Sequence, residues 1–72
     1  MINVALLGFG RIGQMHAHNI SQNKSLKLSY VCERIDKLRK KAKKLYNCSI
    51  EKDYKKIFSD NKVDIVFISS PT

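Results

Sequence analysis

The chain has 72 residues, about half the usual length of one domain, which excludes a catalytic domain joined to a regulatory one. Hydrophobic residues make up 43% of the sequence and charged residues 28%, a composition that predicts a folded protein rather than a disordered one. The 14 Lys and Arg residues outnumber the 6 Asp and Glu residues, and the net charge of +8 allows an anionic partner such as nucleic acid or a membrane surface.

The two cysteines and the termini exclude several other classes of protein. Cys32 and Cys48 have neither the CxxC spacing nor a histidine pair at metal-ligand separation, so we expect free buried thiols and no metal site. The apolar run over residues 2–8 lacks the basic region that precedes the core of a signal peptide. No apolar run approaches the ~20 residues of a membrane-spanning helix. We therefore expect a cytoplasmic protein that does not associate with membranes.

Apolar runs and amphipathic segments alternate along the chain. The run INVALL at residues 2–7 is typical of a strand buried on both faces, and residues 35–46 have one apolar stripe among lysines and arginines. Such alternation builds a parallel sheet through right-handed crossovers. We predict an α/β fold, a partial Rossmann fold with strand order 3-2-1-4 and an edge position for the last strand. The predicted strands span residues 2–7, 26–32, 47–50 and 63–68, and the predicted helices span residues 12–20, 35–46 and 53–58.

A glycine-rich motif joins the first predicted strand to the first predicted helix. It has the spacing G-x-G-x-x-G, in which the first glycine permits a tight turn, the second lets the backbone approach a pyrophosphate, and the third lets the helix pack against the strand. The helix N-terminus then offers N–H groups to the phosphates. The candidate binding residues are Gly8, Phe9, Gly10, Arg11, Ile12 and Gly13.

An acidic residue stands at the expected distance from this motif. Glu33 lies 20 positions after Gly13, at the predicted end of the second strand, where a carboxylate accepts hydrogen bonds from the adenosine ribose. This arrangement predicts a site for NAD. Arg34 follows the acid, and an arginine near this point can bind the 2′-phosphate of NADP, so NADP stays open.

Four stretches together resemble the N-terminus of the glucose-fructose oxidoreductase and myo-inositol dehydrogenase family: VALLGFGRIGQMHAHNI, VCE, KKAKKLY and VDIVFISSPT. The resemblance implies that residues 9–12 line the pyrophosphate and that Glu33 holds the ribose, although the family more often has Asp there. It further implies that the turn formed by Ser69, Ser70 and Pro71 passes beside the nicotinamide ribose.

The same resemblance implies an oxidoreductase that transfers hydride between a nicotinamide and a polyol or sugar hydroxyl. Family members are several times longer and carry a catalytic lysine and a substrate domain beyond the position that matches Thr72. We therefore expect residues 1–72 to form an incomplete NAD(P)-binding Rossmann domain, a truncated fragment with no catalytic residue. An alternative is a subunit completed by a separate chain.

Other features have simpler explanations. His16 and His18 lie two positions apart on a predicted helix and do not share a face, so we expect structural or solvated side chains. Seven basic residues between positions 34 and 44 leave a small nucleic-acid-binding or anion-binding module as a further alternative, although no stacking aromatic residues accompany them. The exposed last strand predicts self-association. The substrate and the oligomeric state are left open.

Overall fold

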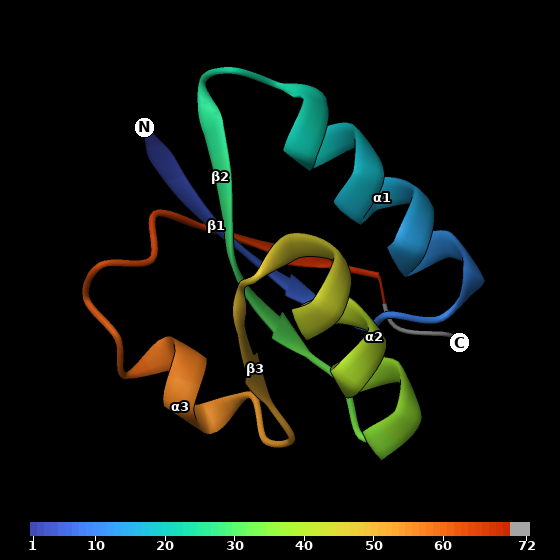
Figure 1. Ribbon diagram of the computed structural model, residues 1–72. Helices are drawn as coiled ribbons and strands as arrows, with labels where there is room; N and C mark the ends of the chain where they lie inside the picture. Colours follow the sequence, from blue (N-terminus) through green and yellow to red (C-terminus); the bar gives the residue numbers. More distant parts are fainter. Residues whose placement is uncertain (70–72) are drawn as a thin grey trace.

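The run INVALL, five apolar residues and Asn3, forms the central strand of a parallel sheet. A computed structural model describes residues 1–69 and orders the strands β3-β2-β1-β4, which confirms the predicted topology (Figure 1). Flanking helices on both faces cover the buried part of β1, Val4 to Leu6, as a strand buried on both faces requires. The elements are β1 Ile2–Leu7, α1 Arg11–Gln22, β2 Leu26–Cys32, α2 Asp36–Tyr46, β3 Ser49–Glu51, α3 Lys55–Phe58 and β4 Ile65–Ile68.

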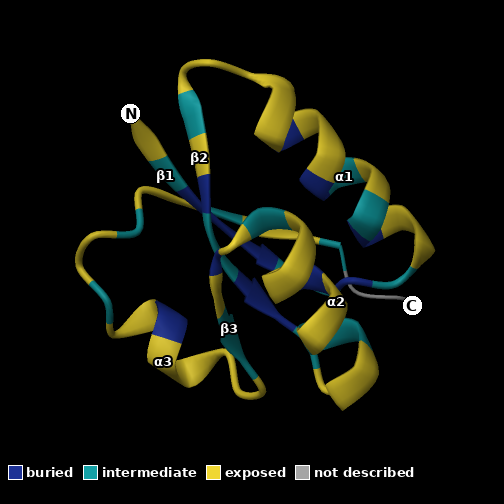
Figure 2. Cartoon of the chain, viewed as in Figure 1, coloured by how far each residue is buried: buried dark blue, intermediate teal, exposed yellow. Residues whose placement is uncertain are grey.

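The two faces of the sheet have separate hydrophobic cores. Helices α1 and α2 lie over one face and α3 lies beside the other, and the buried residues concentrate in β1, in β2 and on the inner sides of the helices (Figures 1 and 2). The core beneath α1 and α2 includes Val4, Leu6, Phe9, Ala17, Ile20, Leu28, Val31, Ala42 and Cys48, and the smaller core beneath α3 includes Ala5, Cys32 and Ile57. Both cysteines are free and buried.

A β-bulge in β2 explains why this strand does not alternate simply. Val4 of β1 pairs with Leu28, but the next residue, Ala5, pairs with Tyr30, so Ser29 is the extra residue. The hydroxyl of Ser29 donates to the side-chain oxygen of Asn3 at 3.0 Å. Beyond the bulge the strand keeps one face toward each of the two cores.

Local backbone geometry moves two predicted boundaries. The third strand begins at Ser49 rather than at residue 47, because Asn47 ends α2 in the left-handed conformation with φ 51° and donates its N–H to the carbonyl of Lys43 at 2.9 Å. The helix expected from residue 53 begins at Lys55. Tyr54 is its N-cap, and no side chain caps the helix; Asp53 accepts the Lys55 N–H at 2.9 Å in an Asx turn just before it.

The last strand is also shorter than predicted, at Ile65–Ile68 rather than residues 63–68. Its entry is held by Asp64 and Asn3. The Asn3 N–H donates to the Asp64 carboxylate at 2.8 Å, and the Asp64 N–H donates to the Asn3 carbonyl at 2.9 Å. Strand β4 then lies at the edge of the sheet, with Ile65 44% exposed and Ile68 67% exposed.

Helix α1 buries two small residues, Gly13 and Ala17, and one large one, Ile20. Gly13, Ala17 and Ile20 face the sheet, whereas Ile12 and Met15 are more than half exposed. Small residues at this interface let α1 approach β1 closely. Within residues 1–69, no helix combines the length and the apolar character needed to cross a membrane.

Candidate dinucleotide site

The glycine loop turns sharply from β1 into α1. Gly8 has φ 102°, a conformation that side-chain-bearing residues rarely adopt, and its N–H donates to the carbonyl of Cys32 at 2.8 Å. Gly10 is the N-cap residue of α1, with no side chain capping the helix. The first-turn N–H groups of α1 have no partners within the helix, so they are available to an anion at this end.

The third glycine holds helix and strand together. A Cβ atom at Gly13 would stand 2.2 Å from the carbonyl oxygen of Gly8 and 3.5 Å from the hydroxyl oxygen of Ser69. By contrast, a Cβ atom at Gly10 would meet no atom within 4 Å. The backbone at Gly10 therefore faces open space, as the approach of a pyrophosphate requires.

Ser69 follows β4 at the same end of the sheet, where its N–H donates to the Leu7 carbonyl at 2.7 Å. Its side-chain hydroxyl is buried and has no hydrogen-bond partner among residues 1–69. A buried unpaired hydroxyl beside the glycine loop fits a bound ligand as its missing partner. Ser70 and Pro71, which were predicted to join this site, lie outside the described residues.

The side chain of Phe9 lies in the core, and its backbone N–H and carbonyl bond to Glu33 and Gln14. The ring is fully buried and packs edge-to-face against Tyr46, with ring centroids 6.3 Å apart. The Phe9 carbonyl accepts a hydrogen bond from the side-chain amide of Gln14 at 3.2 Å. The side chains of Arg11 and Ile12 are exposed.

Glu33 is bonded directly to the glycine loop. One carboxylate oxygen accepts the Phe9 N–H at 2.9 Å, and the other accepts the Ile35 N–H at 2.9 Å. A carboxylate has about four acceptor positions, so roughly two remain for a ligand. Residues that are 24 positions apart in sequence are thereby joined at the carboxyl ends of β1 and β2.

A cavity of about 690 Å³ opens beside this pair. Its walls come from the carboxyl ends of three strands and from the loops that follow them, which is where open α/β sheets bind ligands. The predicted residues Gly8, Gly10, Glu33 and Arg34 line it. Sequence reasoning missed the remaining lining residues, which are Leu7, Cys32, Ile35, Leu38, Lys52, Asp53, Tyr54 and Ile68.

Most of the missed residues are apolar, and one is a thiol. Ile35, Tyr54 and Ile68 are each more than half exposed, so they present apolar surface that an adenine ring could cover.

Burial, and after it the nearby carboxylate of Asp53, raises the pKa of Cys32 above its ordinary value of 9.0. The thiol is therefore protonated near neutral pH and is not a ready nucleophile.

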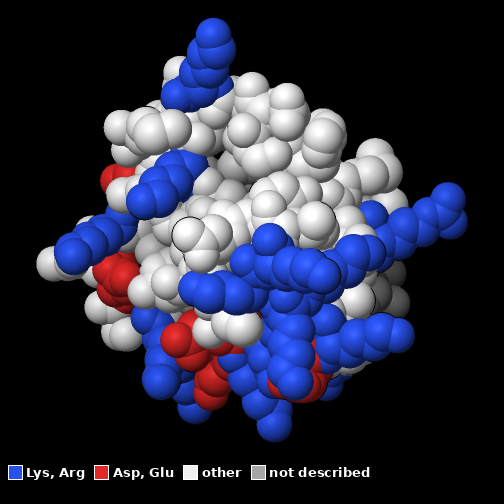
Figure 3. All heavy atoms as spheres, in the orientation of Figure 1, with Lys and Arg blue, Asp and Glu red and all other residues white. Residues whose placement is uncertain are grey.

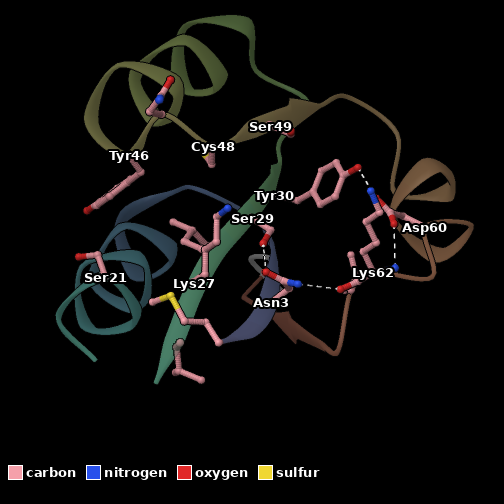
Figure 4. A pocket seen from close by; sticks show the side chains of 15 residues that line it. Asn3, Ser21, Lys27, Ser29, Tyr30, Tyr46, Cys48, Ser49, Asp60 and Lys62 are labelled. Atoms are coloured by element: carbon pink, nitrogen blue, oxygen red, sulfur yellow. Dashed lines mark hydrogen bonds between the residues drawn. The ribbon is translucent and has the colours of Figure 1, made fainter. Parts of the chain in front are cut away.

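A second hollow, of about 470 Å³, lies at the opposite end of the sheet, where the strands begin. Its lining is held by polar contacts, among them the hydrogen bond from the Tyr30 hydroxyl to Asp60 at 2.5 Å and that from the Asn3 amide to the Lys62 carbonyl at 3.1 Å (Figure 4). These bonds tie the segment before β4 to β1 and β2. We assign this hollow a structural role.

The basic residues lie mainly on the outer surface of α2 and around it (Figure 3). Asp36 pairs with Arg39 at 2.9 Å and with Lys40 at 3.1 Å, and chiefly the Lys40 hydrogen bond lowers the pKa of Asp36.

His16 packs against Phe67, with ring centroids 4.6 Å apart, which agrees with the structural role expected for it. Among residues 1–69, no three His, Cys, Asp or Glu side chains are grouped as a metal site.

A buried strand, a glycine turn, a helix and an acid that lines the adjoining cavity together define a dinucleotide-binding Rossmann domain. The family described as "Oxidoreductase family, NAD-binding Rossmann fold" (GFO_IDH_MocA) matches residues 2–72. The chain belongs to this family. It is an NAD-binding oxidoreductase domain, as predicted.

Solved structures agree with the family assignment. A protein from Sinorhizobium meliloti 1021 assigned as a myo-inositol dehydrogenase is 29% identical, with a TM-score of 0.93 over 100% of this chain and 22% of its own. The scyllo-inositol dehydrogenase from Lactobacillus casei, solved with NAD(H) and scyllo-inositol, is 29% identical, with a TM-score of 0.90 over 99% of this chain and 22% of its own.

A myo-inositol dehydrogenase from Corynebacterium glutamicum is 27% identical, with a TM-score of 0.90 over 99% of this chain and 21% of its own. The chain thus spans about a fifth of the length of these relatives. A comparison with curated proteins found no match. These comparisons give no support to the alternative of a nucleic-acid-binding module.

Proposed function

We propose that the cavity beside Glu33 binds the adenosine half of NAD and that the first turn of α1 binds its pyrophosphate. The observation that carries this proposal is the carboxylate of Glu33, held by the Phe9 N–H on one oxygen and by the Ile35 N–H on the other. This leaves free acceptor positions on a carboxylate that lines the cavity, which suits two ribose hydroxyl donors.

The pyrophosphate would lie over the open backbone at Gly10 and accept hydrogen bonds from the N–H groups of Arg11 and Ile12. The space around Gly10 supports this placement, because nothing lies within 4 Å of a Cβ atom built there. The positive end of the helix dipole and the N–H groups act together on the phosphate charge. Gly8 and Gly13 would act indirectly, by holding the turn and the helix in position.

The preferred dinucleotide would be NAD rather than NADP. A 2′-phosphate on the ribose would bring like charges together at Glu33, which disfavours NADP. Arg34 is exposed and lines the same cavity, so its guanidinium could offset part of this repulsion. We therefore expect a preference for NAD with measurable binding of NADP.

In the wider reaction, we propose hydride transfer between the nicotinamide and a polyol or sugar hydroxyl. Bound NAD would accept the hydride of the alcohol carbon, while the hydroxyl proton leaves to a base that residues 1–69 do not provide. The part played by residues 1–72 would be to hold the cofactor as an incomplete domain. Ser69 would lie beside the nicotinamide ribose.

We also propose that the chain self-associates through the outer edge of β4. This strand has no neighbour on its outer side among residues 1–69, and Ile65, Phe67 and Ile68 are between 39% and 67% exposed. An unpaired apolar edge strand offers backbone groups and side chains to a second strand.

Calorimetric titration of the 72-residue chain with NAD, NADP and inorganic pyrophosphate tests the binding proposal. We expect NAD to bind about ten-fold more tightly than NADP, a difference of ~1.4 kcal/mol. Pyrophosphate controls for the net charge of +8, since binding by charge alone weakens steeply with salt. Equal affinities for all three ligands, lost together as salt rises, would refute a built dinucleotide site. Dehydrogenase turnover with a polyol by these 72 residues alone would refute their non-catalytic role.

A further inference from the structure

The guanidinium of Arg39 is enclosed by the turn that carries the acid. Its side chain is only 16% exposed, although it lies on a helix surface rich in lysine. One terminal nitrogen donates to the carbonyl of Glu33 at 2.8 Å and to that of Arg34 at 2.8 Å. The other donates to the Asp36 carboxylate at 2.9 Å.

These contacts hold the carbonyl groups of a turn whose residues Glu33 and Arg34 line the cavity. The Glu33 carboxylate is fixed toward the cavity by backbone N–H groups, while the Glu33 carbonyl is fixed by Arg39. The direction of a side chain follows from the backbone that carries it, so a turn held at both its N–H and carbonyl groups presents one orientation of the carboxylate. A planar guanidinium can make all three bonds at once, and the ammonium of a lysine cannot reproduce this fork.

We propose that Arg39 is a positioning residue for the ribose-binding acid, one that sets how strongly the site recognises the ribose 2′-hydroxyl. The proposal rests on the proposed function, because it needs Glu33 to bind the ribose. Arg39 does not line the cavity and would not contact the ligand itself. Lys40 provides a matched comparison, since it also pairs with Asp36, at 3.1 Å, but no hydrogen bond joins it to the Glu33 or Arg34 carbonyl in the described chain.

The test compares ADP with 2′-deoxy-ADP, two ligands that differ only in the hydroxyl in question. Calorimetry on the wild-type chain should show ADP binding about ten-fold more tightly, the value of one hydrogen bond to a charged group. In Arg39→Lys this preference should fall to about two-fold, while the affinity for 2′-deoxy-ADP stays close to wild type. Lys40→Gln should keep the wild-type preference.

The double variant Glu33→Gln/Arg39→Lys separates positioning from general stability. If Arg39 acts through the carboxylate, adding Arg39→Lys to Glu33→Gln should not lower the ADP preference further. If Arg39 served only the stability of the fold, Arg39→Lys would lower the affinities for ADP and 2′-deoxy-ADP equally and would lower the melting temperature. Wild-type preference in folded Arg39→Lys would overturn the positioning role. Failure of the wild-type chain to bind either ADP or NAD would overturn the proposed function itself.

A measurement on the wild-type chain covers the case in which the variants do not fold. Nitrogen-15 NMR should show the Arg39 guanidinium protons exchanging slowly with water, as bonded and enclosed protons do, both without ligand and with ADP bound. Rapid exchange of these protons in the ADP complex would overturn the proposal, because a mobile guanidinium cannot hold the turn.

Discussion

Gly13 and Gly8 touch across the turn between β1 and α1, and a Cβ atom at Gly13 would stand only 2.2 Å from the Gly8 carbonyl oxygen. Gly10, three residues before Gly13, has open space at the same position. Two glycines of one motif are thus required for different reasons. Gly13 is needed by the fold, whereas the open space at Gly10 suits the proposed approach of the pyrophosphate.

Gly13→Ala should destabilise the chain, whereas Gly10→Ala should leave it folded and lower its affinity for NAD. The first change forces α1 away from β1 at a cost of about 3 kcal/mol. The second places a methyl group where the pyrophosphate is proposed to approach, and it should lower the affinity for NAD at least about ten-fold. Thermal unfolding and calorimetry measure the two effects. A Gly10→Ala chain with wild-type NAD affinity would contradict the placement of the pyrophosphate.

Glu33→Gln should lower the affinity for NAD about ten-fold, because it removes a charged acceptor of ribose hydroxyl hydrogen bonds. It should also narrow the difference in affinity between NAD and NADP, because the negative charge that repels a 2′-phosphate is lost. Glu51→Gln is the matched control, since Glu51 is a half-buried carboxylate outside the cavity that pairs with Lys56 at 4.0 Å. Binding isotherms for NAD and NADP compare the affinities of Glu33→Gln, Glu51→Gln and the wild-type chain. An unchanged NAD-to-NADP ratio in Glu33→Gln would show that this acid does not read the ribose.

The Tyr30–Asp60 hydrogen bond should make stability depend on pH at both extremes. It raises the pKa of Tyr30 above 10.0, so the folded state holds the proton more tightly, and this stability is present below pH 10.0 and lost as pH rises through the folded-state pKa. The same bond lowers the pKa of Asp60 below 3.8, so its contribution is present above pH 3.8 and lost as pH falls through the folded-state pKa.

Tyr30→Phe removes the hydroxyl and should lower the melting temperature at neutral pH, while flattening the loss of stability above pH 10.0 and reducing the loss below pH 3.8. Melting curves from pH 2 to pH 11 compare the variant with wild type. Tyr54→Phe is the control, because no hydrogen bond from the Tyr54 hydroxyl is present among residues 1–69. Parallel pH profiles for wild type and Tyr30→Phe would rule out this bond as the cause.

Ile65→Lys should reduce self-association of the chain. Ile65 begins the edge strand β4 and is 44% exposed, and a charge on an edge strand opposes pairing with a second strand. Sedimentation velocity over a range of concentrations compares Ile65→Lys with Leu45→Lys, a change at a 57% exposed position on helix α2 rather than on β4. Equal reductions in both variants would assign the association to general hydrophobicity.

Local sequence determined much of the fold. Strands β1 and β2 begin and end at the predicted residues. The reason is local: Gly8 ends the first hydrophobic run, and the charged residue Glu33 ends the second. The alternation of strands and helices then predicted the order β3-β2-β1-β4, since right-handed crossovers leave few other topologies. The glycine spacing and the acid 20 positions later followed from the same local pattern.

The tertiary structure decided what depends on contacts between distant residues. Hydrophobic periodicity did not show that Phe9 is buried and Ile12 exposed, because that choice depends on how closely Gly13 lets α1 approach Gly8. No local pattern brings Tyr54 to the cavity. The sequence by itself therefore determined the class of fold and the kind of ligand. Packing alone decided which side chains line the cavity and which groups contact Glu33, because those contacts join separate parts of the chain.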